Sequence, residues 1–546
     1  MTTKLVTTPN VSAQENSPNI PDEGVTSFRQ YRAPRLNQEV YVDPPLDQAA
    51  ELLAANRRLI DQYDSPWKAM RGEARKQLLT DAIRYTSVYR DTTWVDRDPV
   101  RPIIMAGHQP SLFHPGVWFK NFALNHLANE LDATAVNLVV DNDVAKSSSV
   151  RIPTIDPTSG LAAYRAVPYD QAGGGVPYEQ TTVGDLKLFD QFDTNVANIV
   201  RPLVKDPCVH QLWRHAREAI GRCGVAGCAL AQARHGLEGE IGLQTLELPL
   251  GVFCRGRAFA EFALSILTEM PRFQKSYNDS AQDYRVAHGI RSTAHPVPDL
   301  AEKDGWFEAP LWIYGNLSPY RKAAWVRMQD DILEISDLGN RLVRIDTSKM
   351  SDAVDQLTAA MTPEFKLRPR ALLTTMYSRL VLSDLFLHGI GGGKYDQLGD
   401  MVTESFFAIK PPKFMVLSAT VQLPGVQATD IAAEVRGLKR KIRETNYQGE
   451  RFATTSNIDQ KLVDQKLALL QSVPPRGERV QWHREITELN YKLSDQLGDV
   501  RRELQSELAI AQRKAVGQSI LQSREHSFSV FPLSYLTESF KAMLGQ

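Results

Sequence analysis

Residues 101–131, RPIIMAGHQPSLFHPGVWFKNFALNHLANEL, hold the pattern that decides the fold. Ile103 to Met105 form a short apolar strand, and apolar residues three and four apart between Trp118 and Leu131 predict a helix. A helix N-terminus offers free N–H groups and the positive end of a dipole, so the polar turn between these elements suits a phosphate or a carboxylate. A turn that only starts the helix would explain it equally well. The candidate residues are Gly107, His108, Gln109, Ser111 and His114.

A second strand follows this helix. The run AVNLVV, from Ala135 to Val140, predicts a fully buried strand, and Asp141 and Asp143 come directly after it. A strand, a helix and a strand in this order form a βαβ unit, whose parallel sheet binds ligands at the carboxyl ends of its strands. Both polar turns fall at that edge. The two aspartates are expected to hold a ribose, an amino group or a metal there, or else to form a solvated turn.

The composition is that of a globular protein. With 546 residues, 42% hydrophobic and 23% charged, the chain suits roughly three to four domain-sized units, or one large α/β domain with insertions. The formal net charge of -1 argues against a nucleic-acid partner. No apolar run is as long as a membrane span, and the first residues lack the apolar segment of a signal peptide. We therefore expect a cytoplasmic protein without a membrane partner.

The cysteines are expected to be reduced thiols. Four cysteines are too few for a disulfide framework in a chain of this length. Cys223 and Cys228 lie near His210, His215 and His235 in the sequence, but their spacing matches no strong zinc motif. We therefore predict no zinc site among these residues, and we assign no residue of the chain as a metal ligand.

A cationic group follows in the middle of the chain. Arg285, His288, Arg291 and His295 are spaced three and four apart, so on one helix they would share a face. Such a face suits the carboxylates of an anionic small molecule, or is a solvated basic surface. The loop beside it and the nearby Glu308 favour binding. We therefore expect Arg291, His295 and Glu308 to contact a ligand.

A glycine turn follows the short strand predicted for Leu385 to His388. The sequence HGIGGGKYDQLGDMV then enters a helix, and glycines allow backbone N–H groups to approach a ligand closely. The turn is not a Walker A loop, because Tyr395 stands where that motif requires Ser or Thr. It predicts either a helix cap or a ligand site made of Gly391, Gly392, Gly393, Lys394 and Tyr395.

These patterns divide the chain. Residues 1–25 are predicted to be a disordered tail, residues 26–95 a helical collar, and residues 96–425 a core with insertions at about 151–300. In residues 426–520, apolar positions from Ile486 to Ala515 recur with spacings of three, four and four, which predicts one long helix over this range. This rhythm predicts an antiparallel coiled-coil arm that is nearly straight or faintly right-handed, and such an arm usually dimerises. Residues 521–546 are apolar enough to pack back on the core.

Three motifs in this order resemble the bacillithiol biosynthesis cysteine-adding enzymes: AGHQPSLFHPG at 106–116, GIGGGKYDQL at 389–398, and a late coiled coil closed by a Phe-Pro tail. The resemblance implies a Rossmann-like core similar to HIGH-type nucleotidyltransferases and an activity that joins cysteine to a glucosaminyl malate. It also implies that His108 and His114 occupy the place where such enzymes hold nucleotide phosphates. However, His108 replaces the family's first glutamine, so activity and substrate stay open.

Two functions from different classes follow. The first is a ligase or nucleotidyltransferase-like enzyme that joins an amino acid or amine to an acidic acceptor, with ATP or ADP as the candidate cofactor. In it the histidines would neutralise growing negative charge and the aspartates would orient the amine. The catalytic residues would then be His108, His114, Asp141 and Asp143. The second is a non-catalytic scaffold that forms a homodimer through its coiled coil.

Overall fold

The computed structural model of the protein describes residues 28–171, 173–426 and 430–546. They form two compact units. The larger unit comprises the described residues within Met1–Ile152, Ala166–Val421 and Arg524–Gln546, and the smaller comprises those within Pro153–Arg165 and Gln422–Ser523. The tail expected at residues 1–25 lies outside the described residues.

A six-stranded sheet lies at the centre of the larger unit, with the order β1-β14-β13-β2-β3-β6. The strands are β1 (Glu39–Asp43), β2 (Ile103–His108), β3 (Thr134–Val139), β6 (Leu246–Pro249), β13 (Leu385–His388) and β14 (Met415–Thr420). Neighbours are parallel except at the edge, where β1 pairs antiparallel with β14. A mixed α/β chain with a mostly parallel sheet, as the apolar runs predict, is therefore confirmed.

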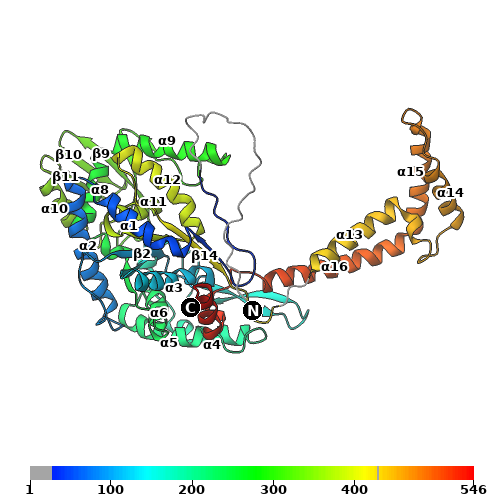
Figure 1. The fold of residues 1–546 in the computed structure, drawn as a ribbon, viewed down its shortest axis with the longest axis horizontal. Helices are drawn as coiled ribbons and strands as arrows, with labels where there is room; N and C mark the ends of the chain where they lie inside the picture. Colours follow the sequence, from blue (N-terminus) through cyan, green and yellow to red (C-terminus); the bar gives the residue numbers. More distant parts are fainter. Residues whose placement is uncertain (1–27, 172, 427–429) are drawn as a thin grey trace. The chain divides into compact units, whose positions relative to one another are not determined.

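Helices cover both faces of this sheet (Figure 1). α3 (Pro115–Glu130) leads from β2 to β3, and α12 (Ile390–Phe407) leads from β13 to β14, so the chain leaves the neighbouring strands β2 and β13 in opposite directions. Because crossovers between parallel strands are right-handed, the two helices lie on opposite faces. The carboxyl ends of β2 and β13 therefore form a topological switch point, where such sheets usually bind their ligands.

A second sheet shares the hydrophobic core of the larger unit and has the order β11-β10-β9-β8-β12. Its strands are β8 (Trp306–Tyr314), β9 (Lys322–Gln329), β10 (Ile332–Ser336), β11 (Leu342–Asp346) and β12 (Lys366–Pro369), with β7 (Glu302–Lys303) beside β8. The other helices of the larger unit are α1 (Ala49–Ile60), α2 (Ser65–Thr86), α4 (Leu186–Val200), α5 (Val209–Cys223), α6 (Ala226–Glu240), α7 (Leu250–Phe253), α8 (Arg257–Leu267), α9 (Met270–His288), α10 (Met350–Ala360), α11 (Ala371–Tyr377) and α17 (Leu533–Met543).

The expected insertion at 151–300 contains helices α4 to α9 as well as strands. It includes part of the paired strands β4 (Ser149–Ile155) and β5 (Ala162–Pro168), and it also supplies β6 to the main sheet. β6 pairs with β3 through Leu246 and Leu248, both fully buried. The insertion is therefore built into the core.

The smaller unit consists mainly of helices: α13 (Ile431–Tyr447), α14 (Gln460–Gln471), α15 (Arg479–Gln496) and α16 (Gly498–Leu521). α13 and α16 lie side by side (Figure 1), with Leu438 packed against Leu504 and Ala511. The single long helix expected across Ile486 to Ala515 is wrong, because the chain bends at Leu497, which has a ψ of 15°. Gly498 follows the bend, and glycine favours a helix break.

The C-terminal segment packs on α3 within the larger unit. The ring of Phe528 lies 4.5 Å from that of Trp118 and 5.5 Å from that of Phe113. The ring of Phe540 in α17 lies 4.7 Å from that of Phe122. These aromatic contacts hold Arg524, at the start of the segment, beside the first turn of α3.

Candidate functional site

A cavity of about 280 Å³ lies at the switch point of the main sheet. It is lined by the first turns of α3 and α12, by Leu417 and Ser418 of β14, and by Arg524 and Glu525. We call it the anion cavity. Two helix N-termini reach it, and each carries a partial positive charge that favours an anion.

The first turn of α12 offers backbone donors to the anion cavity. Among the described residues, the N–H groups of Ile390, Gly391 and Gly392 donate to no acceptor, whereas the Gly393 N–H donates to the Gly389 carbonyl at 2.9 Å. A Cβ at Gly391 would meet no atom within 4 Å. A Cβ at Gly393 would lie 2.4 Å from Val416 Cγ2, so that glycine serves packing. At this turn the anion cavity is lined by Gly389, Ile390 and Gly391, so of the residues expected to form the glycine cradle only Gly391 lines it.

His114 lines the anion cavity as a neutral ring. It is the N-cap of α3, and its Nδ1 accepts the Gly116 N–H at 3.1 Å, so its proton resides on Nε2. Burial lowers the pKa of His114 to about 4, although Glu525 opposes this shift. His114 can therefore donate one hydrogen bond but carries no positive charge at neutral pH.

His108 does not line the anion cavity, contrary to our expectation. It is the last residue of β2, its side chain is buried, and its Nδ1 lies 2.9 Å from the carbonyl of Gln109. Its ring lies 4.4 Å from that of Phe113. Burial, and secondarily the charges of Arg234 and Lys120, hold the pKa of His108 well below its usual value. A buried neutral ring cannot supply the charge that the sequence motif suggests.

Lys120 supplies a cation that we did not expect. It lies one turn into α3, only 5% exposed, and its Nζ donates to the carbonyl of Gly107 at 2.6 Å while lining the anion cavity. Burial, with a smaller effect of Arg234, lowers its pKa to about 8. The sequence does contain a signal for it. The lysine stands among apolar residues in the stretch WFKNFAL, and the helical period places this lysine on the buried side of the helix.

Arg524 supplies a second unexpected cation. Its Nη2 donates to Ser418 Oγ at 3.0 Å, and its Nε lies 3.4 Å from Glu525 Oε1. Gly116 allows this approach, because a Cβ there would lie 2.7 Å from Arg524 Nη2 and 2.2 Å from the Ala419 carbonyl oxygen. Two cations and one carboxylate leave the cavity wall positive.

Asp141 and Asp143 point to different places, so they do not form the expected pair. Asp143 Oδ2 accepts from Gln109 Nε2 at 3.1 Å, and its Oδ1 lies 3.4 Å from Arg321 Nη1. Asp141 Oδ1 instead accepts the Gly251 N–H at 2.9 Å. Asp141 lines a second cavity of about 250 Å³ near the ends of β3 and β6, which we call the Asp141 cavity.

The Asp141 cavity holds two carboxylates in unlike environments. Arg368 contacts Glu179 at 3.0 Å and Lys366 Nζ lies 3.5 Å away. Although burial raises the pKa of Glu179, these cations bring it below its usual value. Asp141 is not paired in this way, so burial and the charge of Glu179 raise its pKa to about 7. Two carboxyl groups with separated pKa values can exchange a proton with a bound amine.

Asp141→Asn should change how stability depends on pH. Because the pKa of Asp141 is higher in the folded protein than in the unfolded chain, wild-type stability falls as pH rises from about 4 to about 7, by at most about 1.4 kcal/mol per pH unit. Asparagine does not titrate and can still accept the Gly251 N–H, so the variant should gain stability relative to wild type across this range. Urea unfolding at several pH values measures this, with Asp143→Asn as the matched control. A difference from wild type that is the same at every pH would refute it.

The remaining expected ligand residues lie outside both cavities. Gly289 has a φ of 62° and ends α9, so Arg291 and His295 fall in the following loop, exposed, and do not share a helix face with Arg285. Glu308 lies 2.5 Å from Arg370 in an ion pair. Among the other expected residues, Ser111 donates its N–H to the Gln109 carbonyl, the Lys394 carbonyl accepts from Tyr284, and the Tyr395 side chain is 43% exposed.

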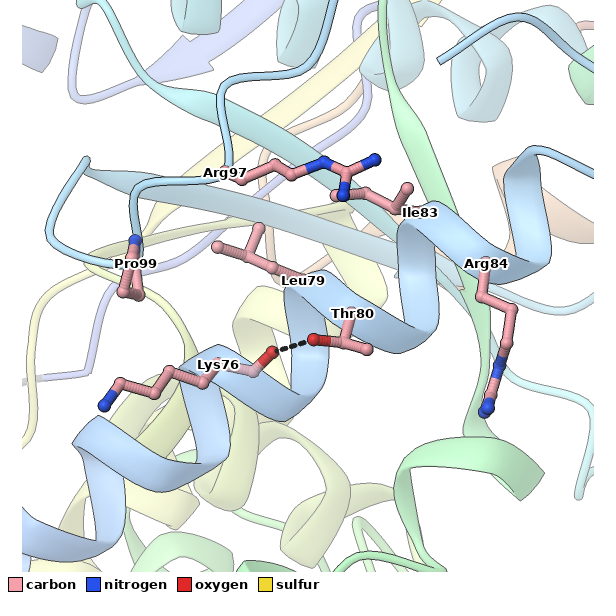
Figure 2. Close-up of a pocket in the computed structure, with 7 residues that line it drawn as sticks. All are labelled: Lys76, Leu79, Thr80, Ile83, Arg84, Arg97 and Pro99. Atoms are coloured by element: carbon pink, nitrogen blue, oxygen red, sulfur yellow. Dashed lines mark hydrogen bonds between the residues drawn. The ribbon is translucent and has the colours of Figure 1, made fainter. Parts of the chain in front are cut away.

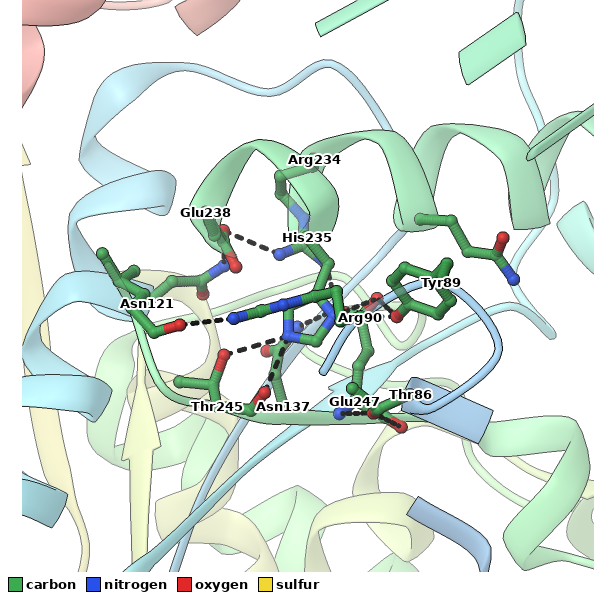
Figure 3. A network of polar contacts seen from close by, with 12 residues as sticks. Thr86, Tyr89, Arg90, Asn121, Asn137, Arg234, His235, Glu238, Thr245 and Glu247 are labelled. Atoms are coloured by element: carbon green, nitrogen blue, oxygen red, sulfur yellow. Dashed lines mark hydrogen bonds and ion pairs between the residues drawn. The ribbon is translucent and has the colours of Figure 1, made fainter. Parts of the chain in front are cut away.

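A buried polar network lies between α3, α6 and β6 (Figure 3). Arg234 lies between Glu238 and Glu247, and the side chains of all three are at most 2% exposed. Trp118 Nε1 and Asn121 Nδ2 of α3 each donate to Glu238 Oε1 at 2.7 Å. The network joins α3 to α6 and β6, and it thereby fixes the helix that carries Lys120.

A hollow on α2 is a weaker candidate (Figure 2). It measures about 350 Å³ and contains the exposed cations Lys76, Arg84 and Arg97. Arg84 pairs with Asp81 at 2.5 Å. The loop beside the hollow leads into the amino end of β2, which is the edge opposite to the one where parallel sheets bind ligands.

Neither a metal centre, nor a membrane-spanning helix, nor a known relative indicates the function of the described residues, so it has to be inferred from the chemistry of the two cavities. Within the described ranges, no three potential metal ligands gather, and His210, His215 and His235 contact Asp193, Glu240 and Tyr89 instead. None of the described helices is both long and apolar enough to cross a membrane. No protein-family model matches the chain, and neither does any curated protein.

Proposed function

We propose that the protein is an enzyme of the ligase or nucleotidyl-transfer type that binds the phosphates of ATP or ADP in the anion cavity. The observation that supports this most is the convergence of Lys120, Arg524 and the free N–H groups of α12 on one cavity at the switch point. Cations and unpaired backbone donors at a helix N-terminus are what a phosphate requires. The proposal extends to joining an amine to an acidic small-molecule acceptor.

The residues of the anion cavity would act by positioning and by charge. Lys120 and the N–H groups of Ile390 and Gly391 would donate to oxygens whose negative charge grows in the transition state. His114 would donate through Nε2. A bound nucleotide would supply an activated phosphoryl or nucleotidyl group. Asp141 would hold the amine and accept its proton, because its carboxyl group titrates near neutral pH.

The finer assignments of fold and family are part of this proposal. The main sheet would be a Rossmann-like core, and α13, α15 and α16 would form a coiled-coil arm that makes a homodimer. The resemblance to bacillithiol biosynthesis cysteine-adding enzymes supports an amino acid as the amine substrate. The residue that supports this likeness least is His108, which is buried and stands where the family has a glutamine.

Gly391→Ala tests the proposed phosphate site. Since a methyl group there meets no protein atom but enters the anion cavity, the variant should fold with unchanged or higher stability and lose at least about tenfold in affinity for ADP. Isothermal titration calorimetry with ADP and ATP measures the affinity. Gly221→Ala in α5, where a Cβ also meets no atom within 4 Å, is the matched control.

Two results would count against the proposed function. Equal ADP affinity in folded Gly391→Ala and in wild type would exclude the first turn of α12 as the phosphate site. If ATP, ADP, cysteine and sugar malates all leave the melting temperature of wild type unchanged, the non-catalytic scaffold becomes the better interpretation.

A further inference from the structure

Lys120 is a buried amine that pairs with no carboxylate of the described residues. Its Nζ donates to the Gly107 carbonyl at 2.6 Å, and the charge that acts on it is that of Arg234. Burial and this second cation both favour the neutral amine, so at neutral pH roughly a tenth of the molecules carry it, given a pKa of about 8. A neutral lysine amine is a nucleophile, whereas the ammonium ion is not.

The cavity that holds this amine also offers donors to a phosphate. The N–H groups of Ile390 and Gly391 donate to no acceptor among the described residues, and Arg524 Nη1 is buried without a hydrogen-bond partner. Gly391 is exposed and the Glu525 side chain is 59% exposed, so the cavity reaches solvent. A small molecule with its phosphate on these donors would therefore have its other end beside Lys120.

We propose that Lys120 is a modification site for acyl phosphates, the mixed anhydrides of a carboxylic acid and phosphate. The neutral Nζ attacks the carbonyl carbon and forms an amide bond, while the bond from that carbon to the bridging oxygen breaks. Phosphate leaves with the bonding electron pair, and the amine releases one proton to solvent. No electron is transferred to or from the protein. The donors that hold the phosphate also stabilise the negative charge that grows on it as it leaves.

Acylation would weaken the anion cavity, because an amide carries no positive charge and Arg524 would remain as its cation. The modified protein should therefore bind ADP about as weakly as Lys120→Met. This consequence rests on the proposed nucleotide site, whereas the acylation itself requires only the phosphate donors and the amine. The acyl phosphate would thus regulate the same site that the nucleotide occupies.

Acetyl phosphate tests the proposal on the full-length protein. Mass spectrometry of peptides should show faster acetylation at Lys120 than at Lys76, an exposed lysine beside Arg84 and Arg97 that controls for the attraction of an anion to positive charge. With acetic anhydride, which has no phosphate, the ratio of acetylation at Lys120 to that at Lys76 should be at least about tenfold lower, because only the bound phosphate compound is held in position. Inorganic phosphate should protect Lys120 but not Lys76.

Gly391→Ala provides a variant that keeps the amine and alters the phosphate donors. Its methyl group meets no protein atom within 4 Å and enters the anion cavity, so acetyl phosphate should acetylate Lys120 more slowly in this variant than in wild type. Gly221→Ala, where a Cβ also meets no atom within 4 Å, should leave the rate unchanged.

Two results would overturn the proposal. One is an unmodified Lys120 in protein whose Lys76 is acetylated by acetyl phosphate, and the other is an equal ratio of the two sites with both reagents. The outcome is also separate from that of the proposed function. Acetylation of Lys120 in a protein that does not bind ADP would support the modification site and exclude the nucleotide site, and ADP binding with an unreactive Lys120 would do the reverse.

Discussion

Lys120→Met should reduce the affinity of the protein for ADP by about ten- to a hundredfold at neutral pH. The variant removes the buried ammonium group of the anion cavity but keeps a side chain of similar length among the same apolar neighbours. A hydrogen bond to a charged group contributes about 1.5–3 kcal/mol, which corresponds to this range of affinities. Titration calorimetry measures the change. Lys275→Met, on an exposed lysine of α9 that pairs with Asp279, is the control.

The affinity of wild type for ADP should also depend on pH. Lys120 has a pKa of about 8 in the free protein, and a bound anion raises it, so above about pH 8 the binding reaction must take up a proton. The affinity should therefore fall by up to about tenfold per pH unit above this value. Lys120→Met should lack this loss. Equal slopes in the two proteins would show that Lys120 does not contact the phosphate.

Arg234→Met should destabilise the fold by about 3–5 kcal/mol, the usual cost of removing one partner from a buried ion pair. Methionine leaves Glu238 and Glu247 without their common cation, and the side chains of both are fully buried. Chemical unfolding measures this loss, and adding Glu247→Gln to the variant should recover part of it.

Arg214→Met provides the matched control for Arg234. Arg214 pairs with Glu240 at the surface, with both side chains more than 40% exposed, so its loss should cost less than about 1 kcal/mol. Equal destabilisation by the two variants would show that the network around Arg234 has no special role in holding α3.

The strands of the main sheet and the helix after β2 could be predicted because the pattern of apolar residues in each follows directly from how that element is buried. Strands buried on both faces require continuous apolar runs, as at Ile103 to Met105 and Ala135 to Val140. The helix after β2 has apolar residues three and four positions apart, which is the helical period. β1 was not predicted, since all its residues are half-buried and its pattern is weak. The prediction of one long helix across Leu497 was wrong. The apolar spacing continues unchanged through the bend at Leu497, which Gly498 follows, so spacing alone does not reveal the bend.

The candidate site could be predicted only in part. His114 and Gly391 line the anion cavity as the two turns indicate, because the carboxyl ends of neighbouring parallel strands meet at one edge. Arg524 could not be found in this way, since only the packing of Phe528 on Trp118 brings it there. Arg291 and His295 were assigned from spacing alone, and spacing does not reveal that Gly289 ends the helix. The enzyme activity and the substrates stay predictions.

A crystal structure of the protein with ADP tests the central claim most directly. We predict phosphate oxygens within hydrogen-bonding distance of the Ile390 and Gly391 N–H groups and of Lys120 Nζ, in the cavity between α3 and α12. Well-ordered ADP at any other place, with the anion cavity empty, would contradict the assignment of this cavity as the nucleotide site.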